Sequence, residues 1–354
     1  MSGSSLDGLD IAYCRFERQA NQWKGTLLQA ETFAYSAVWE SRLRDLPTQS
    51  ALTYLQTHVY FGHYCASLVN DFIAKHELVG KVDFIASHGH TIFHDPARNY
   101  TAQIGDGAAL AALTGVAVVA DFRSTDVALG GEGAPLVPIG DLLLFNHYNY
   151  CLNLGGICNI TCTDHNTVQA FDIAPCNQVL NYYANKLGFA YDSNGNLAAE
   201  GQVHQELVAA LDELPFYKQA APKSLANNFS TTVVIPLVNF AQLSEQDALA
   251  TLTEHIAHQV ADSLKGTAEN TCLVTGGGAF NATLIHRIQA LTPVQLVLPD
   301  PLLIQFKEAY IFAFLGLLRY EEQPNTLHQI TGSRMDASSG CIYLPGILKS
   351  TTHV

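Results

Sequence analysis

Basic residues are scarce in this sequence. Its 354 residues include 18 Lys and Arg against 32 Asp and Glu, which gives a formal net charge of −14 at pH 7. No Lys- or Arg-rich block offsets this charge, so the sequence argues against a nucleic-acid-binding surface and against binding to an anionic membrane. The expected partners are therefore small molecules, and the few basic side chains matter more if a substrate is an anion.

Long apolar runs are also missing. The longest, residues 310–318, has nine residues, whereas about 20 are needed to span a bilayer. No secretory segment is visible either, so the cytoplasm is the expected location. Charged residues make up only 14% of the chain and hydrophobic residues 48%. This composition excludes a disordered chain, and the length is sufficient for two domains with substantial cores.

The cysteines do not form an obvious disulfide or metal framework. There are eight, at positions 14, 65, 151, 158, 162, 176, 272 and 341. In a long chain without a signal peptide they are expected to be reduced, buried, small apolar residues. Cys158 and Cys162 could suggest zinc, but no second Cys or His pair follows at ligand spacing.

The most informative stretch is residues 151–176. An apolar strand at 151–154 leads into Gly155-Gly156 and a second short strand at 157–162. This pattern predicts a β-hairpin whose tight turn lets backbone N–H groups approach an anion closely. Asp172 then ends the next apolar stretch.

Two other glycine-containing turns resemble this one in type. A Ser/Gly turn occupies residues 2–8, and a Gly-Gly-Gly loop at 276–278 lies between a strand and a helix. A strand, glycine loop and helix in succession can cradle a phosphate with backbone amides. Because these turns lie on separate halves of the chain, they predict a nucleotide held in a cleft between two domains.

The rest of the chain alternates between helices and short strands, which predicts an α/β protein with ligands at strand ends. Residues 51–74 are predicted to be helical, with Leu52, Leu55, Val59 and Phe61 contributing to an apolar stripe. Ser244 is predicted to cap a helix whose apolar stripe is formed by Leu252, Ile256, Val260 and Leu264.

Polar residues follow two of the predicted strands. His88 and His90 come after the first, and they would share one face of an extended chain. A metal site, polar contacts in a cleft and structural histidines all remain open for this pair. Asp121 and Arg123 follow the second strand. Glu308, near the start of an apolar helix, could simply interact with the helix dipole.

Eight blocks of this sequence occur in the order seen in anhydro-N-acetylmuramic acid kinases, and the chain resembles that family over essentially its whole length. The blocks are MSGSSLDG, SHGHTIFHDP, QIGD, VVADFRSTDVALGGEGAPLVP, LNLGGICNIT, FDIAPCN, PKS and VTGGGAFN. The resemblance implies the fold of the actin, hexokinase and Hsp70 superfamily: α/β, with two ribonuclease-H-like domains and ATP in the interdomain cleft. The implied domains are 1–140 and 141–354, with the C-terminal segment packing back on the first.

The resemblance also implies that one strand is missing from the first domain. In the family a strand precedes the first phosphate turn, whereas this open reading frame begins inside the turn. Because that strand is central in the fold, its loss would remove hydrogen-bond partners from both neighbours.

The activity implied by the resemblance is a coupled hydrolysis and phosphorylation. Enzymes of the family use ATP and water to open the 1,6-anhydro bond of anhydro-N-acetylmuramic acid and phosphorylate O6, in the recycling of bacterial cell-wall fragments. ATP and Mg²⁺ are the implied cofactors, and a homodimer is the implied assembly. The alternatives are another sugar or small-carboxylate kinase of the same fold and a non-catalytic nucleotide-binding relative.

The resemblance assigns roles to individual residues. Asp172 would be the catalytic base, and Asp7 would hold Mg²⁺ through water. Arg123 would bind the lactyl carboxylate of the sugar, because a guanidinium pairs bidentately with a carboxylate. The other implied substrate contacts are His88, Thr91, Asp121 and Glu308. The implied phosphate and nucleotide contacts are Ser2, Gly3, Ser4, Ser5, Gly8, Leu154, Gly155, Gly156, Thr275, Gly276, Gly277 and Gly278.

Overall fold

The structure is a computed structural model that describes residues 1–3, 6–20, 22–164, 167–226 and 228–346. Ser4 and Ser5, which are expected in the first phosphate turn, lie outside the described residues. The chain divides into two compact units, one formed by 1–144 with 308–354 and the other by 145–307. Each unit is described by itself below.

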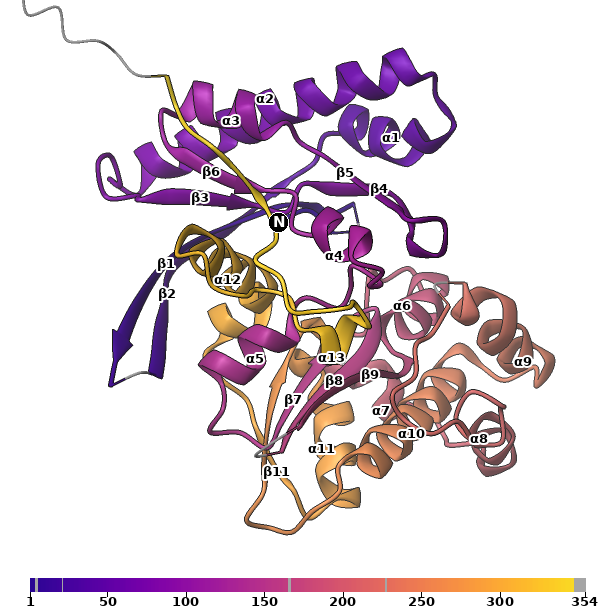
Figure 1. The fold of residues 1–354 in the computed structure, drawn as a ribbon. Coiled ribbons are helices and arrows are strands. Elements are labelled where there is room, and N and C mark those ends of the chain that lie inside the picture. Colours follow the sequence, from indigo (N-terminus) through magenta and orange to yellow (C-terminus); the bar gives the residue numbers. More distant parts are fainter. Residues whose placement is uncertain (4–5, 21, 165–166, 227, 347–354) are drawn as a thin grey trace, which may run out of the picture. The chain divides into compact units, whose positions relative to one another are not determined.

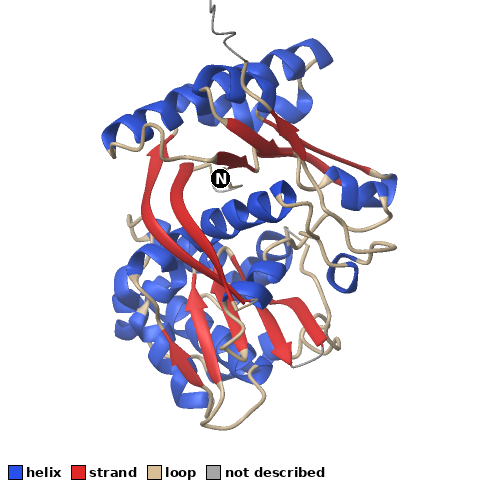
Figure 2. Cartoon of the chain, turned by 60° about the vertical axis from the view of Figure 1, so that its left-hand side comes forward, coloured by secondary structure: helices blue, strands red, loops and turns tan. Residues whose placement is uncertain are grey.

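The strands of the first unit form two hairpins and one three-stranded sheet. They are β1 (Gly8–Gln19), β2 (Gln22–Ala34), β3 (Phe84–Ser87), β4 (His90–Asp95), β5 (Tyr100–Ile104), β6 (Ala117–Ala120) and β12 (Cys341–Tyr343). β1 pairs with β2, and β4 with β5, in antiparallel fashion. β6 lies between β3, its parallel partner, and β12, its antiparallel partner. The β1–β2 hairpin is long and curved (Figure 2).

Helices lie on both sides of the strands β3 and β6. Within the first unit, α2 and α3 lie on one side and α12 on the other (Figure 1). The helices are α1 (Ala37–Asp45), α2 (Ala51–Lys75), α3 (Gly107–Thr114), α4 (Ser124–Ala128), α5 (Pro138–Leu144), α12 (Pro301–Tyr320) and α13 (His328–Thr331). Only the part of α12 from Glu308 onward belongs to this unit. On the α12 side, Phe84 of β3 stacks on Tyr320 with ring centroids 5.5 Å apart.

The helix predicted over 51–74 is confirmed as α2, but its predicted apolar stripe is wrong. Leu52 is 66% exposed and Leu55 is 60% exposed, while Phe61 is fully buried. At 100° per residue, Leu52, Leu55 and Val59 lie about 120–180° around the helix from Phe61. The buried face is instead formed by Thr57, Phe61, Cys65, Val69 and Phe72.

The second unit is built on one mixed five-stranded sheet with the order β11-β10-β7-β8-β9. Its strands are β7 (Tyr150–Leu154), β8 (Ile157–Asp164), β9 (Thr167–Pro175), β10 (Thr271–Thr275) and β11 (Gln295–Val297). The central strand β7 is antiparallel to β8 and parallel to β10. The sheet therefore joins an antiparallel hairpin, β8–β9, to a parallel pair, β10–β11, through one strand.

The helices of the second unit bury the apolar face of this sheet. They are α6 (Asn177–Lys186), α7 (Asn196–Glu200), α8 (Gln205–Asp212), α9 (Ile235–Phe240), α10 (Glu245–Ser263) and α11 (Ala282–Leu291). The cap and stripe predicted for α10 are confirmed. Ser244 Oγ accepts a hydrogen bond from the Asp247 N–H at 3.1 Å, and Leu252, Ile256, Val260 and Leu264 are all buried in the core.

Among the described residues one helix, α12, is long and apolar enough to cross a membrane by length and composition alone. It has 20 residues and so extends well beyond the predicted apolar run at 310–318. Its most apolar window is 56% buried inside the protein, which is typical of a core helix.

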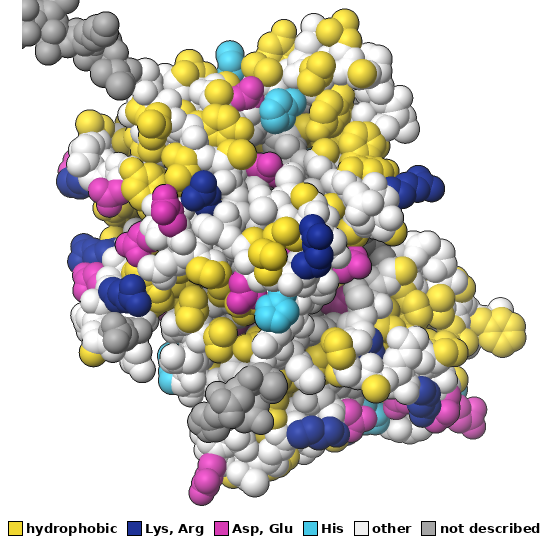
Figure 3. Space-filling model, in the orientation of Figure 1, with side chains coloured by type: hydrophobic (Ala, Val, Ile, Leu, Met, Phe, Trp, Pro, Cys, Tyr) yellow, Lys and Arg dark blue, Asp and Glu magenta, His cyan; other side chains and the backbone are white. Residues whose placement is uncertain are grey.

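The exposed basic residues are mostly isolated or paired with acids. On the face drawn in Figure 3, Lys and Arg side chains occur singly among acidic and hydrophobic ones. Lys75 Nζ lies 2.7 Å from a Glu31 carboxylate oxygen, and Lys218 Nζ lies 2.8 Å from that of Glu213. This face therefore presents no concentrated positive charge to a polyanion.

Candidate active site

The predicted hairpin over 151–162 is confirmed by the pairing of β7 with β8, which places Leu154 opposite Cys158. Its turn is fastened to the start of α6. The carbonyl of Gly156 accepts from the Cys176 N–H at 2.8 Å, and the carbonyl of Gly155 accepts from the Asn177 N–H at 3.1 Å. Asn177 Nδ2 donates to the Leu154 carbonyl at 3.0 Å.

These contacts orient the N–H groups of the turn. In a trans peptide unit the C=O and N–H bonds point in opposite directions. Because the carbonyls of Leu154 and Gly155 face the start of α6, the N–H groups of Gly155 and Gly156 point away from it. The turn can thus present two successive backbone donors to an anion such as a phosphate.

The loop after β10 packs directly against this turn. Gly276 has φ of +83°, and a Cβ at that position would lie 2.5 Å from Asn153 Oδ1 and 2.8 Å from the Leu154 carbonyl carbon. Thr275, at the end of β10, is buried and its Oγ1 donates to the Leu152 carbonyl at 3.4 Å. Two predicted nucleotide-binding segments are therefore in contact within one unit.

Gly276→Ala is expected to lower the free energy of unfolding by about 1–3 kcal/mol, because it forces a side chain into a strained, crowded backbone position. Urea unfolding measures this. Gly277→Ala is the matched control, since its Cβ would meet only Asn177 Nδ2, at 3.5 Å. Equal stability of the two variants would contradict the close contact at Gly276.

Asp172 lies at a β-bulge in β9. Cys158 pairs with Ala174 and Asn159 with Asp172, so Ile173 is an extra residue in this strand. Ile173 and Ala174 are both buried, at 2% and 0% exposure, whereas Asp172 is half-buried. A bulge changes the direction of the neighbouring side chains. Here the extra residue comes directly after Asp172, near the end of β9 that pairs with the start of β8, beside the Gly155-Gly156 turn.

One oxygen of the Asp172 carboxylate is held by Ser224, the last residue of the PKS block at 222–224, and by Leu225, which follows it. Oδ2 accepts from the Leu225 N–H at 2.8 Å and from Ser224 Oγ at 3.2 Å. Among the described residues no protein donor contacts Oδ1. Desolvation raises the pKa of Asp172 above its ordinary value, while the hydrogen bonds from Leu225 and Ser224 oppose this rise. The carboxylate is thus positioned by one oxygen and has the other available.

In the first unit, Arg123 is fixed by two internal acceptors. Its Nε donates to His88 Nε2 at 2.9 Å, and its Nη1 donates to the Gly133 carbonyl at 2.6 Å. These two bonds leave Nη2 and one N–H of Nη1 unused. The arrangement leaves a donor fork that suits a carboxylate.

His88 contacts Arg123 with one nitrogen and the backbone with the other. Nδ1 lies 3.1 Å from the Gly89 carbonyl, so Nδ1 carries the proton and Nε2 accepts from Arg123. Burial, followed by the charge of Arg123, lowers the pKa of His88 well below its usual value. His88 therefore orients Arg123. His90 does not share its face in one strand, because Gly89 between them has φ of +72°.

Asp126 is a site residue that the sequence analysis did not single out. It is fully buried, and its Oδ2 accepts from the Gly133 N–H at 2.8 Å. Its Oδ1 accepts from Thr331 Oγ1 at 2.7 Å. Asp126 thus fixes the loop whose carbonyl holds Arg123. The sequence feature that could have pointed to Asp126 is its position three residues after Arg123, within the block VVADFRSTDVALGGEGAPLVP.

The remaining predicted substrate contacts are in the same unit. The Glu308 side chain is reached by solvent but has protein atoms all around it. The loss of bulk water around it raises the pKa of its carboxyl, and the positive charge of Arg123 opposes this rise. Asp121 has φ of +61° and its Oδ1 accepts from Ser124 Oγ at 2.5 Å. Thr91 lies exposed on β4, where its Oγ1 accepts from Gln103 Nε2 at 3.3 Å.

The described part of the first phosphate turn has a buried anchor. Ser2 is 2% exposed; its Oγ accepts from the Tyr35 hydroxyl at 2.6 Å and lies 2.8 Å from His90 Nδ1. The side chain of Ser2 is therefore engaged inside the unit. The Gly3 carbonyl accepts from the Leu6 N–H at 3.4 Å. Asp7 is exposed, and Gly8 begins β1.

Comparison with known proteins identifies the family. The anhydro-N-acetylmuramic acid kinase family profile matches residues 1–345. The anhydro-N-acetylmuramic acid kinase of Saccharophagus degradans is 36% identical over 367 residues, covering 98% of each chain. That of Pasteurella multocida is 35% identical over 363 residues, covering 97% of this chain and 95% of the relative.

Similarity to solved structures is weak. The activator of the 2-hydroxyisocaproyl-CoA dehydratase from Clostridium difficile aligns with a TM-score of 0.35 and 16% identity, over 53% of this chain and 66% of that one. The assignment therefore depends on the sequence relatives, which match almost end to end. By that criterion, this chain belongs to the anhydro-N-acetylmuramic acid kinase family.

Proposed function

We propose that this protein uses ATP and water to convert 1,6-anhydro-N-acetylmuramic acid into N-acetylmuramic acid 6-phosphate and ADP. The reaction would return cell-wall fragments to metabolism in the cytoplasm. We further infer that the two units are ribonuclease-H-like domains that bind ATP between them, and that the active assembly is a homodimer.

The proposed step forms two bonds and breaks two. The oxygen of water bonds to C1 as the C1–O6 bond breaks, and O6 bonds to the γ-phosphorus as the bond to ADP breaks. The proton lost by water passes to Asp172 and later to solvent. Phosphoryl transfer itself needs mainly positioning and charge neutralisation.

The observation that supports this proposal most strongly is the placement of Asp172. Its strand partner Asn159 lies three residues beyond Gly156 of the hairpin turn. A general base and a phosphate-binding turn thus share one end of one sheet. A base must lie within hydrogen-bond reach of the water it activates, and Asp172 Oδ1 has no donor among the described residues.

Arg123 supports the choice of substrate. Anhydro-N-acetylmuramic acid carries a lactyl carboxylate, and a guanidinium fork fixed by His88 and Gly133 is suited to bind it. We assign the neighbouring Glu308, Asp121 and Thr91 to the same sugar subsite.

Magnesium fits the residues present as a partly hydrated ion. Among the described residues no cluster of three or more His, Cys, Asp or Glu could hold a metal. Mg²⁺ usually keeps several waters and uses one or two carboxylates together with substrate phosphates. The exposed Asp7 would hold it in that way, and the ion would neutralise charge on the phosphates.

The proposal is tested by comparing the closed and opened sugars as acceptors. We expect ADP release with 1,6-anhydro-N-acetylmuramic acid and little with N-acetylmuramic acid. Mass spectrometry should show a product heavier than the anhydro sugar by one water and one phosphoryl group. Faster turnover of the opened sugar would instead indicate an ordinary sugar kinase of the same fold.

A further inference from the structure

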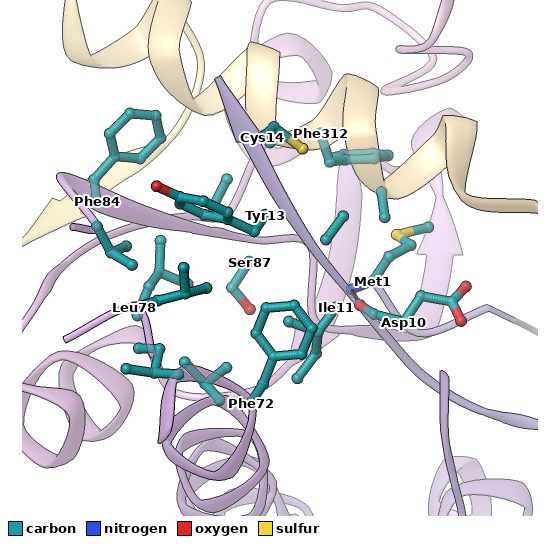
Figure 4. A pocket seen from close by; sticks show the side chains of 18 of the residues that line it. Met1, Asp10, Ile11, Tyr13, Cys14, Phe72, Leu78, Phe84, Ser87 and Phe312 are labelled. Carbon is teal, nitrogen blue, oxygen red and sulfur yellow. Dashed lines mark hydrogen bonds between the residues drawn. The ribbon is translucent and has the colours of Figure 1, made fainter. Parts of the chain in front are cut away.

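The cavity drawn in Figure 4, of about 330 Å³, lies in the first unit. Phe72, Phe84 and Phe312 are among the side chains that line it. Walls of this kind favour apolar groups, because burying a polar group without a hydrogen bond is costly. An anion needs hydrogen-bond donors instead, and the second unit gathers donors of this kind around the Gly155-Gly156 turn.

The N–H groups at the start of α6 are already used by that turn. Those of Cys176 and Gln178 donate to the Gly156 carbonyl, at 2.8 and 3.1 Å. That of Asn177 donates to the Gly155 carbonyl at 3.1 Å. In many proteins these first N–H groups of a helix bind a phosphate. Here an anion at the turn relies on the N–H groups of the two glycines and on side chains beside them.

Gln178 provides a side chain that lies against the turn. A Cβ at Gly156 would be 3.2 Å from Gln178 Cγ and 3.5 Å from Gln178 Nε2. Gly156 and Gln178 are both exposed, so a ligand can reach them. Among the described residues no acceptor contacts Gln178 Nε2. Both N–H groups of this amide are therefore available to a ligand at the turn.

Ser230 fixes the orientation of the Gln178 amide. Its hydroxyl donates to Gln178 Oε1, and only 3% of Ser230 is exposed. The oxygen of a side-chain amide accepts hydrogen bonds, and its nitrogen carries two donors. Because Oε1 is held by a buried hydroxyl, Nε2 is the end of the amide that remains free beside Gly156.

The backbone that carries Ser230 has an uncommon conformation. Ser230–Val234 form one π-helical turn, in which the Ile235 N–H donates to the Ser230 carbonyl, five residues earlier. Turns of this type are rare and occur frequently at functional sites. Here the turn leads directly into α9 and places a buried hydroxyl against a side chain of α6.

We propose that Gln178 is a phosphate-binding residue, whose Nε2 donates to a phosphate oxygen of ATP held at the Gly155-Gly156 turn, and that Ser230 is its positioning residue. The identity of the nucleotide rests on the proposed function. A phosphate carries several acceptor oxygens, so one oxygen can accept from the turn and another from Nε2. The charge on the phosphate strengthens such a bond. A neutral amide supplies this donor in a chain with only 18 Lys and Arg.

The test measures binding of ADP and of adenosine to the full chain by calorimetry, in the presence of Mg²⁺. Gln178→Ala should raise the Kd of ADP at least about tenfold, the low end for a hydrogen bond to a charged group. Gln178→Glu should raise it further, because a carboxylate repels a phosphate. Adenosine has no phosphate, so its Kd should be unchanged in both variants.

The matched control is Gln295→Glu, which adds the same charge to an exposed position of the same unit. Gln295 pairs with Thr271 at the start of β10, whereas the loop 276–278 follows the end of that strand. This variant should bind ADP as the wild type does. An unchanged Kd for ADP in Gln178→Ala would overturn the proposal, as would an equal rise in the Kd of adenosine.

Ser230→Ala tests the positioning role. It should raise the Kd of ADP by a smaller factor, and it should have no further effect in the Gln178→Ala background, because Ser230 acts only through the amide. Weaker ADP binding in both backgrounds would overturn that role. Turnover is not measured in these experiments, so a failure to phosphorylate the sugar would reject the proposed function and leave this inference standing.

Discussion

Asp172→Asn is expected to lower kcat by at least about 100-fold, the low end for loss of a general base. The amide keeps the size of the side chain and can still accept from the Leu225 N–H, so the fold should be retained. It cannot take a proton from the attacking water. The measurement is steady-state ADP release with anhydro-N-acetylmuramic acid at saturating ATP, with KM for ATP as the check on nucleotide binding.

The pH dependence of kcat/KM is a second test of Asp172 as the base. A base works only when deprotonated, so kcat/KM should fall as the pH drops through the pKa of Asp172, which desolvation raises above 3.8. Ser224→Ala removes a hydrogen bond that stabilises the carboxylate. The acidic limb of the profile should therefore move to higher pH in that variant, with activity at high pH little changed.

The matched control is Glu269→Gln, which removes an exposed carboxylate from a loop of the same unit. Wild-type turnover is expected there. If Asp172→Asn also turned over at a near-normal rate, Asp172 would not be the base. If Ser224→Ala left the acidic limb in place, the group titrating in the profile would be another one.

Arg123→Lys is expected to lower kcat/KM for the sugar by about 10- to 150-fold, which corresponds to the roughly 1.5–3 kcal/mol of a hydrogen bond to a charged group. A lysine keeps the charge but loses the planar fork. It also cannot bond to His88 and the Gly133 carbonyl in the same geometry. Most of the loss should appear as a higher KM, because the carboxylate is bound in both ground and transition states.

The control for Arg123→Lys is a substrate that lacks the lactyl carboxylate. The corresponding anhydro sugar lacking the lactyl group has no carboxylate, so wild type and Arg123→Lys should process it with similar kcat/KM. An equal loss on both substrates would mean that Arg123 acts elsewhere in the site. KM for ATP should stay unchanged throughout.

Local sequence signals predicted a large part of the fold correctly. The hairpin over 151–162 follows from two apolar strands around Gly155-Gly156, and the start of α10 follows from Ser244 and its capping bond to the Asp247 N–H. Such features are decided by residues a few positions apart. They are therefore visible in the sequence before any tertiary contact is known.

Features that depend on distant contacts were missed. At the bulge, the successive residues Ile173 and Ala174 are both buried, which no local pattern indicates. Nothing local in the sequence indicated that the nitrogens of His88 contact Arg123, 35 residues away, and the adjacent Gly89 carbonyl. The burial of α2 likewise depended on which of its faces the rest of the unit covers.

The bond between Asp126 and Thr331 has a consequence for biosynthesis. The first unit combines 1–144 with 308–354, whereas 145–307 forms a continuous unit. On the ribosome the chain emerges from its N-terminus, and compact units tend to fold as they are completed. The middle of the chain can thus reach its native state first, while the N-terminal part must wait for α13 before Asp126 finds its hydroxyl partner.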